Sequence, residues 1–429
     1  MTNSNGHSGA DSESSTHSSS TFQIRPLLIG LFASNLGDGA TLFAIPWLVS
    51  SGTSNALTLS LLMLAGRAPY LFASIPVGNL ADKREPAGLM LASSIFRIAV
   101  LGVLIMVSQH VGALVWVLGT AAFFIGLSDM VFDTAAEVAV VRMARPDDLA
   151  RVNGHVRTIE LVTGDLIGRP IGAALLKVGQ TVPFLANLVL SLVSLAAVWP
   201  LRGAAAPREP VSPALAAGRS KGGFGLVARH PSLRLLALLS MVLTFFYNAM
   251  LGVQVLFVRE VLRTGAFGFA LLLALAAVSS VAGSQLAGRV RTRPGGGLEA
   301  RLRGSLAAMA LAFFLQSVAR STWTALPGYL LGGAAVAFWA VSAATARQRI
   351  CPPDVVGRVS GVFRVITWGA GPLGITAGGL YASTTKHWLG APASLWSVFM
   401  IGGIACAVML VTCWIPISRV HANADDTQE

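Results

Sequence analysis

The 429-residue chain is 54% hydrophobic and only 12% charged, with a mean hydropathy of +0.68. Because soluble domains carry roughly 25% charged residues, this composition excludes a soluble globular protein and predicts one that is built for lipid. A formal net charge of +12 is also compatible with nucleic-acid binding, so the positions of the charges along the chain must decide between these readings.

The chain begins with a serine-rich segment, residues 1–21, that has no apolar core. This composition predicts a disordered cytoplasmic tail and not a signal peptide. Apolar stretches long enough to cross a bilayer, about 20 residues each, then follow in an orderly series. Their ranges are 26–49, 57–81, 87–108, 113–141, 153–176, 181–201, 232–257, 266–288, 302–319, 323–347, 357–382 and 392–416. The sequence therefore predicts an all-α polytopic membrane protein with 12 transmembrane helices.

Lysine and arginine alternate between the loops on the two sides of the predicted membrane. With both termini inside, the inside segments hold 23 of the 31 basic residues and the outside loops hold five, and the remaining three lie within spans. Cytoplasmic loops concentrate these residues, so the pattern predicts a multi-pass protein of the cell membrane with cytoplasmic termini. The basic charge is explained by topology, and we do not expect a nucleic-acid partner.

An internal repeat relates the two parts of the chain. Residues 145–166 align with residues 352–373 at an offset of 207. The matching residues are Pro146, Asp147, Arg151, Val152, Gly154, Arg157 and Gly164 with Pro353, Asp354, Arg358, Val359, Gly361, Arg364 and Gly371. This offset covers six spans, so two parallel six-helix halves are predicted, an arrangement typical of transporters. We expect halves at 22–201 and 232–418, a cytoplasmic linker at 202–231 and a cytoplasmic tail at 419–429.

The stretch "GNLADKRE" at 78–85, directly after the second span, resembles the G-x-L-A-D-R signature of the major facilitator superfamily. In that family the glycine at Gly78 permits close packing. The acid at Asp82 faces the positive end of the eleventh helix, where helix-dipole attraction favours it. The resemblance implies a cytoplasmic gate formed by Gly78, Asp82, Lys83 and Arg84. The chain departs from the pattern at Pro86 and Ala87, where further basic residues are usual.

Three further stretches, 34–49, 129–154 and 228–239, resemble the branch of that superfamily that contains bacterial exporters of siderophores, macrolides and other secondary metabolites. The resemblance covers essentially the whole chain after residue 21. It implies a secondary transporter in the lipid bilayer that exports a small amphipathic compound. Twelve spans need no partner to form a pathway, so we expect a monomer, and the buried acids described next lead us to expect that export is coupled to protons. Antibiotic resistance is among the functions of such exporters.

Charged residues also fall at membrane depth, and all of them lie in the first half: Asp38, Arg67, Arg97, Asp129, Asp133, Glu137, Glu160, Asp165 and Arg169. An ionised side chain at a helix centre costs roughly 2.5–3.5 kcal/mol, so each must face a partner or water. Asp129, Asp133 and Glu137 recur every four residues and share one stripe of a helix. Our hypothesis is that Asp38, Asp129 or Asp133 carries the coupling proton, with Arg67 and Arg97 as switching partners.

Some of these charges have partners nearby in the sequence. Asp165 and Arg169 are spaced i,i+4, which suits an ion pair on one helix face. Glu160 follows Arg157 by three residues, and Glu137 precedes Arg142 by five. The alternative to a proton relay is therefore a set of static ion pairs that hold the half together. In the same region Gly164, Gly168 and Gly172 form an i,i+4 row that permits close helix packing.

The second half offers polar and aromatic residues as candidates for a substrate cavity. They are Tyr247, Asn248, Trp339, Thr367 and Trp368. Pockets for amphipathic compounds are mostly apolar and aromatic, with a few polar anchors. The alternative is that these side chains serve in packing or in an interfacial belt.

Other functional classes fit the sequence less well than an exporter. The sequence has no G-x-x-x-x-G-K-[ST] loop, so this chain alone is not expected to use ATP. Asp129 and Asp133 form the D-x-x-x-D spacing with which membrane prenyltransferases hold Mg²⁺-diphosphate, but the second acidic motif of such enzymes is missing. We therefore expect no catalytic residues, no metal and no cofactor. An importer that uses the same proton site, and a sensory or scaffolding protein, stay open as alternatives.

Overall fold

The computed structural model describes residues 10–107, 114–143, 149–203, 223–289, 297–351 and 353–413. This part of the chain is almost entirely helical and contains no β-strand. In the first half the helices are α1 (Ala10–Gly52), α2 (Ala56–Phe72), α3 (Ser74–Lys83), α4 (Pro86–Val107), α5 (Leu114–Met143), α6 (Leu149–Ile159), the π-helix η3 (Glu160–Gly168), α7 (Arg169–Val178), α8 (Val182–Val198) and the 3₁₀ turn η4 (Trp199–Leu201).

The described part of the second half is also helical. Its helices are α10 (Gly223–Arg229), α11 (Pro231–Leu256), the π-helix η5 (Phe257–Val261), α12 (Ala266–Arg289), α13 (Gly297–Val318), α14 (Thr322–Ile350), α15 (Pro353–Leu389) and α16 (Ala391–Thr412). The second predicted span corresponds to α2 with α3, the fifth to α6, η3 and α7, and the seventh to α11 with η5. With these grouped, the described helices match all 12 predicted spans, and the predicted fold class is confirmed.

Within the described residues, eight helices are each long and apolar enough to cross a membrane unaided. Of the other four spans, the second and the fifth fall short for physical reasons that the sequence shows. The second is divided near Ala73, after Pro69 has removed a backbone donor. The fifth carries Glu160, Asp165 and Arg169, so its mean hydropathy is low. At the start of the chain, α1 begins at Ala10, within the segment predicted as a disordered tail, whereas residues 1–9 lie outside the described part.

The chain forms two compact units. The first consists of Met1–Leu42 with Phe72–Pro210, and the second of Phe43–Leu71 with Val211–Glu429. The end of α1 and α2 as far as Leu71 thus group with the helices of the second half. The halves expected at 22–201 and 232–418 stay a prediction. Most of the expected linker at 202–231, namely 204–222, and the whole tail at 419–429 lie outside the described residues.

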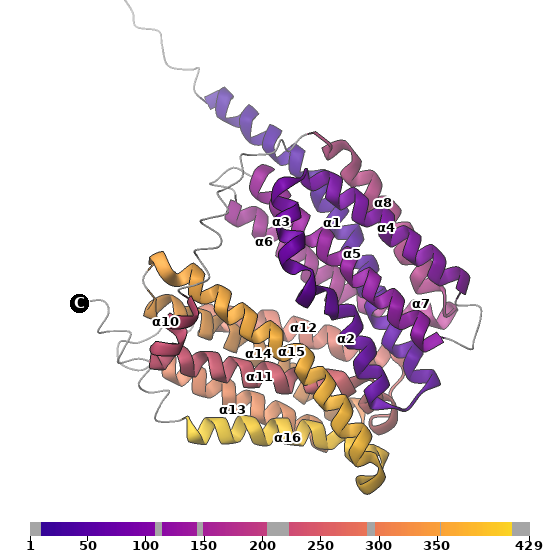
Figure 1. The fold of residues 1–429 in the computed structure, drawn as a ribbon, viewed down its shortest axis with the longest axis vertical. Helices are drawn as coiled ribbons and strands as arrows, with labels where there is room; N and C mark the ends of the chain where they lie inside the picture. The colour runs from indigo at the N-terminus through magenta and orange to yellow at the C-terminus, as the bar shows by residue number, and fades with distance from the viewer. Residues whose placement is uncertain are drawn as a thin grey trace, which may run out of the picture. The chain divides into compact units, whose positions relative to one another are not determined.

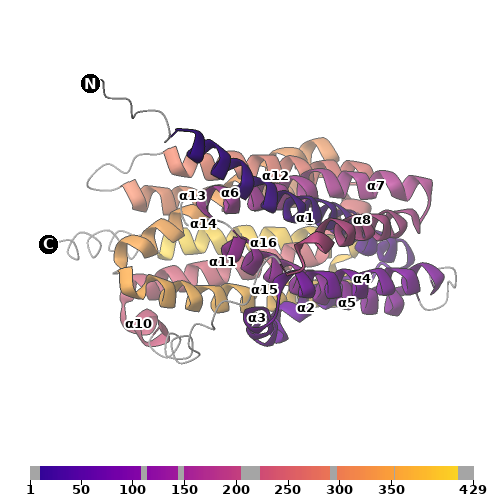
Figure 2. The ribbon, with the colours of Figure 1, turned by 90° about the horizontal axis from the view of Figure 1, so that it is seen from above.

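Inside each unit the long helices pack side by side. In the first unit α4 contacts both α5 and α8, and α3 contacts α5 (Figure 1). In the second unit α11 packs along α15, α12 along α14, and α13 against α14 and α16 (Figure 2). The rings of Phe257 of η5 and Phe399 of α16 pack at a tilt of 40° with their centroids 4.4 Å apart.

Glycines set the closest helix crossing in the first unit, between α1 and the η3–α7 segment. A Cβ atom at Gly172 would lie 2.5 Å from the carbonyl oxygen of Ala40, and one at Gly168 would lie 3.0 Å from the Cα of Gly39. The glycine row expected from the sequence therefore does serve close packing, through Gly168 and Gly172. A Cβ at Gly164 would lie 3.8 Å from the nearest atom, the carbonyl oxygen of Asn35, but a Cβ at Gly39 would collide with the carbonyl oxygen of Gly164, so this position also belongs to the crossing.

The second unit repeats this crossing between α11 and α15. A Cβ at Gly374 would collide with the carbonyl oxygen of Phe245, and one at Gly378 with that of Ala249. In both units the fifth predicted span of a half thus rests directly on the backbone of the first.

A Gly172→Leu variant is expected to lose at least about 1–3 kcal/mol of stability, the usual cost of overpacking a tight contact. The added side chain meets backbone atoms of α1, which cannot rotate away. The measurement is the melting temperature of the purified protein in detergent. Gly102→Leu in α4 is the matched control, because a Cβ there meets no atom within 4 Å. Equal melting temperatures for the two variants would contradict the crossing.

Candidate functional site

Arg97 lies at the centre of the first unit, on α4. Only 1% of the residue is exposed, which makes it the largest fully buried side chain described. One turn earlier α4 carries Ser93 and Ser94, whose hydroxyls donate to the carbonyl of Met90. The guanidinium also lies over the ring of Phe132, 5.7 Å from its centroid. A buried guanidinium must be paired, because an unpaired charge in low dielectric costs several kcal/mol.

The first partner of Arg97 is Asp38 on α1. Nη1 of Arg97 donates to both carboxylate oxygens of Asp38, at 3.0 Å and 2.8 Å. The same nitrogen donates to the Ser34 hydroxyl at 2.6 Å, and that hydroxyl donates in turn to Asp38 at 3.2 Å. Ser34 and Asp38 are four residues apart, so one face of α1 presents both groups to the arginine.

The second partner is Asp129 on α5. Nη2 of Arg97 lies 2.7 Å from Oδ1 of Asp129, and this ion pair is buried, with side-chain exposures of 2% and 12%. Nε of Arg97 donates to the hydroxyl of Ser128 at 3.2 Å, and that hydroxyl donates to the carbonyl of Ser93 at 2.9 Å. Arg97 therefore bridges acids from two different helices, and α4 holds the bridge in place.

Asn187 on α8 brings a fourth helix into this network. Its amide nitrogen donates to Thr41 at 2.9 Å and to Asp38 at 3.4 Å. Its amide oxygen accepts from Ser191. The sequence analysis missed Asn187, although an asparagine in an otherwise apolar span is a polar group that needs partners. Ser34 and Ser128 were missed as well, because hydroxyls are common in transmembrane helices.

The network carries more acid than base. Two carboxylates, on Asp38 and Asp129, share one guanidinium. One proton can therefore be accepted without leaving Arg97 unpaired, since the other carboxylate keeps it neutralised. This set of Asp38, Arg97 and Asp129 is called the acid–arginine triad below. Of the two arginines that the sequence offered as switching partners, Arg97 is the one in contact with the acids.

The acidic stripe on α5 is not uniform. Asp129 is buried, Asp133 is partly buried and Glu137 is exposed. Among the described residues no ion pair is formed by Asp133 or Glu137. The exposure of the acids thus increases along the stripe from Asp129 to Glu137. The sequence spacing alone did not distinguish the three acids.

Among the described residues, the other charges expected at membrane depth form no ion pair with the triad. Arg67 on α2 is exposed, and no described ion pair includes it. Arg169 pairs with Asp165 at 2.6 Å, as the i,i+4 spacing indicated. Arg157 pairs with Glu160 at 2.7 Å. Both acids belong to η3, and π-helical turns are frequent at functional sites.

The expected gate motif lies on α3 and the turn that follows it. The surroundings of Gly78 are open, and Lys83 and Arg84 are exposed. Position 82 is helical, but the side chain of Asp82 lies outside the described part. Arg142 of α5 donates to the carbonyls of Ala81 and Arg84, both at 3.4 Å. Arg142, missed as a member of this motif, ties the turn to the end of α5.

The substrate-cavity candidates of the second half are placed as follows. Asn248 is buried on α11, donates to the carbonyl of Thr244 at 2.9 Å, and lies beside Gly371 of α15. Tyr247 is half-buried, and Trp339 is buried on α14. Thr367 donates to the carbonyl of Phe363 in its own helix, and the side chain of Trp368 lies outside the described part. Asn248 is thus the candidate seen at a helix contact.

Comparison with known proteins bears on the whole chain. The sequence profile of the Major Facilitator Superfamily matches residues 27–375. The multidrug efflux pump Tap of Mycolicibacterium fortuitum is 28% identical over 370 residues, which cover 82% of this chain and 88% of the pump.

Solved structures share the fold at low sequence identity. An inward-facing bacterial homologue of the iron transporter ferroportin is 15% identical with a TM-score of 0.72, over 91% of this chain and 98% of that one. An inward-facing, unoccupied bacterial homologue of the human lysosomal transporter Spinster is 16% identical with a TM-score of 0.69, over 95% and 98%. Together with the profile match and the 12-helix architecture, these similarities place the chain: it belongs to the Major Facilitator Superfamily and is a polytopic membrane transporter.

Proposed function

We propose that this transporter exports a small amphipathic compound, such as a secondary metabolite, a siderophore or a drug, in exchange for protons. The single observation that carries the proposal is the buried acid–arginine triad, in which two carboxylates share one guanidinium. The similarity to a multidrug efflux pump supports the outward direction. The protein would work as a monomer in the cell membrane with both termini in the cytoplasm, in keeping with the distribution of arginine and lysine among the loops.

The triad suggests how a proton and a conformational change are coupled. When both acids are ionised, Arg97 ties α1 and α5 to α4. When Asp129 accepts a proton, its attraction to Arg97 falls, while Asp38 keeps the guanidinium paired. A conformation in which α5 moves away from α4 then becomes less costly. Protonation shifts the equilibrium between two states only if it stabilises one of them more than the other, and the loss of a buried ion pair in one state supplies this difference.

The enzyme alternative has less support. Asp129, the first acid of the D-x-x-x-D spacing, has its Oδ1 atom 2.7 Å from Arg97. A Mg²⁺-diphosphate would have to displace that guanidinium from a buried site. Transporters of the same superfamily also share the fold. We therefore assign the carboxylates to ion pairing and proton exchange, and not to metal binding.

The test deletes the gene in its own host and compares metabolites in the medium and in the cell pellet by mass spectrometry. We expect at least one compound to move from the medium to the pellet, and expression of the wild-type gene to restore it. Addition of a protonophore to wild-type cells should reproduce the deletion. Slower depletion of an external compound in the deletion strain would show import and overturn the direction. If neither pool changed under several growth conditions, the exporter proposal would fail.

A further inference from the structure

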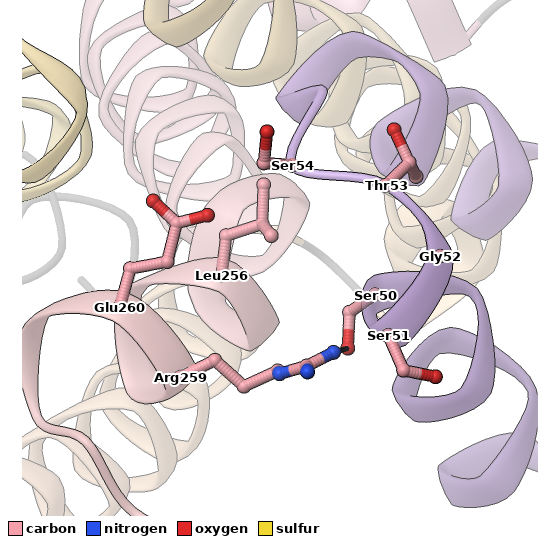
Figure 3. Close-up of a pocket in the computed structure, with 8 residues that line it drawn as sticks. All are labelled: Ser50, Ser51, Gly52, Thr53, Ser54, Leu256, Arg259 and Glu260. Atoms are coloured by element: carbon pink, nitrogen blue, oxygen red, sulfur yellow. Dashed lines mark hydrogen bonds between the residues drawn. The ribbon is translucent and has the colours of Figure 1, made fainter.

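A cavity of about 390 Å³ opens in the second unit, and none of its lining residues belongs to the acid–arginine triad. Its lining residues are Ser50, Ser51, Gly52, Thr53, Ser54, Leu256, Arg259 and Glu260 (Figure 3). This volume falls in the range of small-ligand sites, roughly 300–1,000 Å³. The proposed function makes no use of this cavity, although it combines four hydroxyls with one cationic and one anionic side chain.

Two chain segments build the cavity. One is the end of α1 with the short connection to α2, where the amide oxygen of Asn55 accepts from Leu57 and fixes the start of α2. The other is the π-helix η5, which follows α11 and carries Arg259 and Glu260. Consecutive residues on a helix point in different directions, so these two opposite charges diverge. Figure 3 shows Arg259 reaching toward Ser50 while Glu260 points in another direction.

The guanidinium of Arg259 in the cavity has protein contacts but also hydrogen-bond donors that no described contact uses. Nη1 of Arg259 donates to the Ser50 hydroxyl at 3.1 Å, and the guanidinium lies 5.7 Å from the centre of the Trp47 ring. Guanidinium has five N–H donors in a fixed fork, and the described contacts occupy one of them. The face of Trp47 keeps the fork in place, so Arg259 is prepared to bind an oxyanion through two parallel hydrogen bonds.

The hydroxyls divide into two groups. Ser50 and Ser51 donate to backbone carbonyls of α1, at 2.7 Å and 2.5 Å, so their hydrogens are used. Thr53 accepts from the amide of Asn55, and Ser54 accepts from Nζ of Lys386 at 3.1 Å. A hydroxyl that accepts still has its own hydrogen to give. Thr53 and Ser54 are therefore available as donors, and Lys386 adds positive charge behind Ser54.

The anionic side chain in the cavity, Glu260, needs hydrogen-bond donors from a ligand. Within the described part of the chain, Glu260 forms no hydrogen bond and no ion pair. Its carboxylate offers about four acceptor sites, and a ligand with several N–H donors would satisfy them. The cavity thus presents both donors for an oxyanion and acceptors for an ammonium group, and Lys386 and Arg259 are near enough to attract the Glu260 carboxylate.

We propose that this cavity binds a zwitterionic group in which an oxyanion and a primary amine are a few bonds apart, as in phosphoethanolamine. Arg259, Thr53 and Ser54 would bind the phosphate, and Glu260 would bind the ammonium group. The cavity lies where α1 and η5 end and α2 begins. Lipid headgroups lie at the ends of transmembrane helices, so the same chemistry is available there from phosphatidylethanolamine and, in water, from the free compound.

The experiment measures lipid binding to the purified full chain by native mass spectrometry. The probes are phosphatidylethanolamine, its N,N-dimethyl derivative and phosphatidylcholine with the same acyl chains. Affinity is expected to fall along this series, because each methyl group removes an N–H that Glu260 can accept. The total decrease should be at least about tenfold, the effect of losing one charge-assisted hydrogen bond. Competition by free phosphoethanolamine identifies a soluble zwitterion as the ligand, whereas binding that only the lipid achieves identifies the headgroup; either result supports the site.

Three variants separate this site from general attraction to lipid. Glu260→Gln is expected to abolish the preference for the primary amine and to keep phosphate binding. Arg259→Gln should weaken all three lipids by about tenfold. Arg263→Gln is the control, since Arg263 is an exposed arginine of the same connection that does not line the cavity. Size-exclusion profiles and melting temperatures check that each variant is folded. Equal binding of the three lipids to the wild type, or equal losses in Arg259→Gln and Arg263→Gln, would overturn the proposal.

Discussion

An Arg97→Gln variant is expected to lose transport and about 3–5 kcal/mol of stability, because breaking a buried ion pair by removing one partner leaves an uncompensated charge. In this protein the substitution would leave two buried carboxylates without a cation, because Asp38 and Asp129 both pair with this guanidinium. The measurements are the melting temperature in detergent and substrate efflux from cells. Arg157→Gln is the matched control, because the side chain of Arg157 is 82% exposed in its ion pair.

A triple variant distinguishes the loss of a counter-charge for the two acids from the loss of the packing contacts of Arg97. If the damage comes from unpaired carboxylates, Arg97→Gln combined with Asp38→Asn and Asp129→Asn should regain much of the melting temperature without regaining transport. A structural role of the guanidinium through Ser34, Ser128 and Phe132 alone would leave the triple variant as unstable as Arg97→Gln. An Arg97→Gln protein with wild-type stability would contradict the triad itself.

An Asp129→Asn variant is expected to fold and to bind substrate but to lose uphill transport driven by a proton gradient. In proteoliposomes a gradient of one pH unit supplies about 1.4 kcal/mol per proton, which drives about a tenfold substrate accumulation at one proton per substrate. In the variant the accumulation ratio should fall to about one, while exchange of labelled for unlabelled substrate continues. The reason is that asparagine keeps the size of the aspartate and cannot carry the proton.

The matched control for this variant comes from the same stripe of α5. Glu137→Gln changes an exposed acid two turns further along, outside the described ion pairs, and should keep the full accumulation ratio. Asp38→Asn is expected to be more harmful to stability than Asp129→Asn, because Asp38 also bonds to Ser34 and Asn187. Full coupling in the Asp38, Asp129 and Asp133 variants alike would refute the proton-carrier hypothesis.

The sequence alone predicted the helices closely, because lipid imposes a strict length and charge rule on every span. The range 181–201, for example, became Val182–Leu201, and 266–288 became Ala266–Arg289. The same rule made Asp38, Arg97 and Asp129 stand out, since charges in apolar helices are costly. Which acid meets which arginine depends on how helices cross in space, and no periodicity within one helix contains that information.

The same limit explains why the sequence did not distinguish Arg97 from Arg67 or indicate Asn187. Arg67 and Arg97 were equivalent on sequence grounds, but the first is exposed and the second is 1% exposed. Asn187 joins the network only because α8 approaches α1 where Gly37 leaves room for its side chain. Such complementarity between a glycine and an amide on a distant helix becomes visible only in three dimensions.

The π-helix η3 lies where the two repeats differ in length by one residue. Within it, Gly164 corresponds to Gly371 at an offset of 207. From its last residue onward, Gly168 and Gly172 correspond to Gly374 and Gly378 at an offset of 206. The first copy thus holds one residue more than the second, whose equivalent stretch lies in the uninterrupted helix α15. The wider turn of the π-helix accommodates the additional residue, so both copies make the same glycine contact with their neighbouring helix.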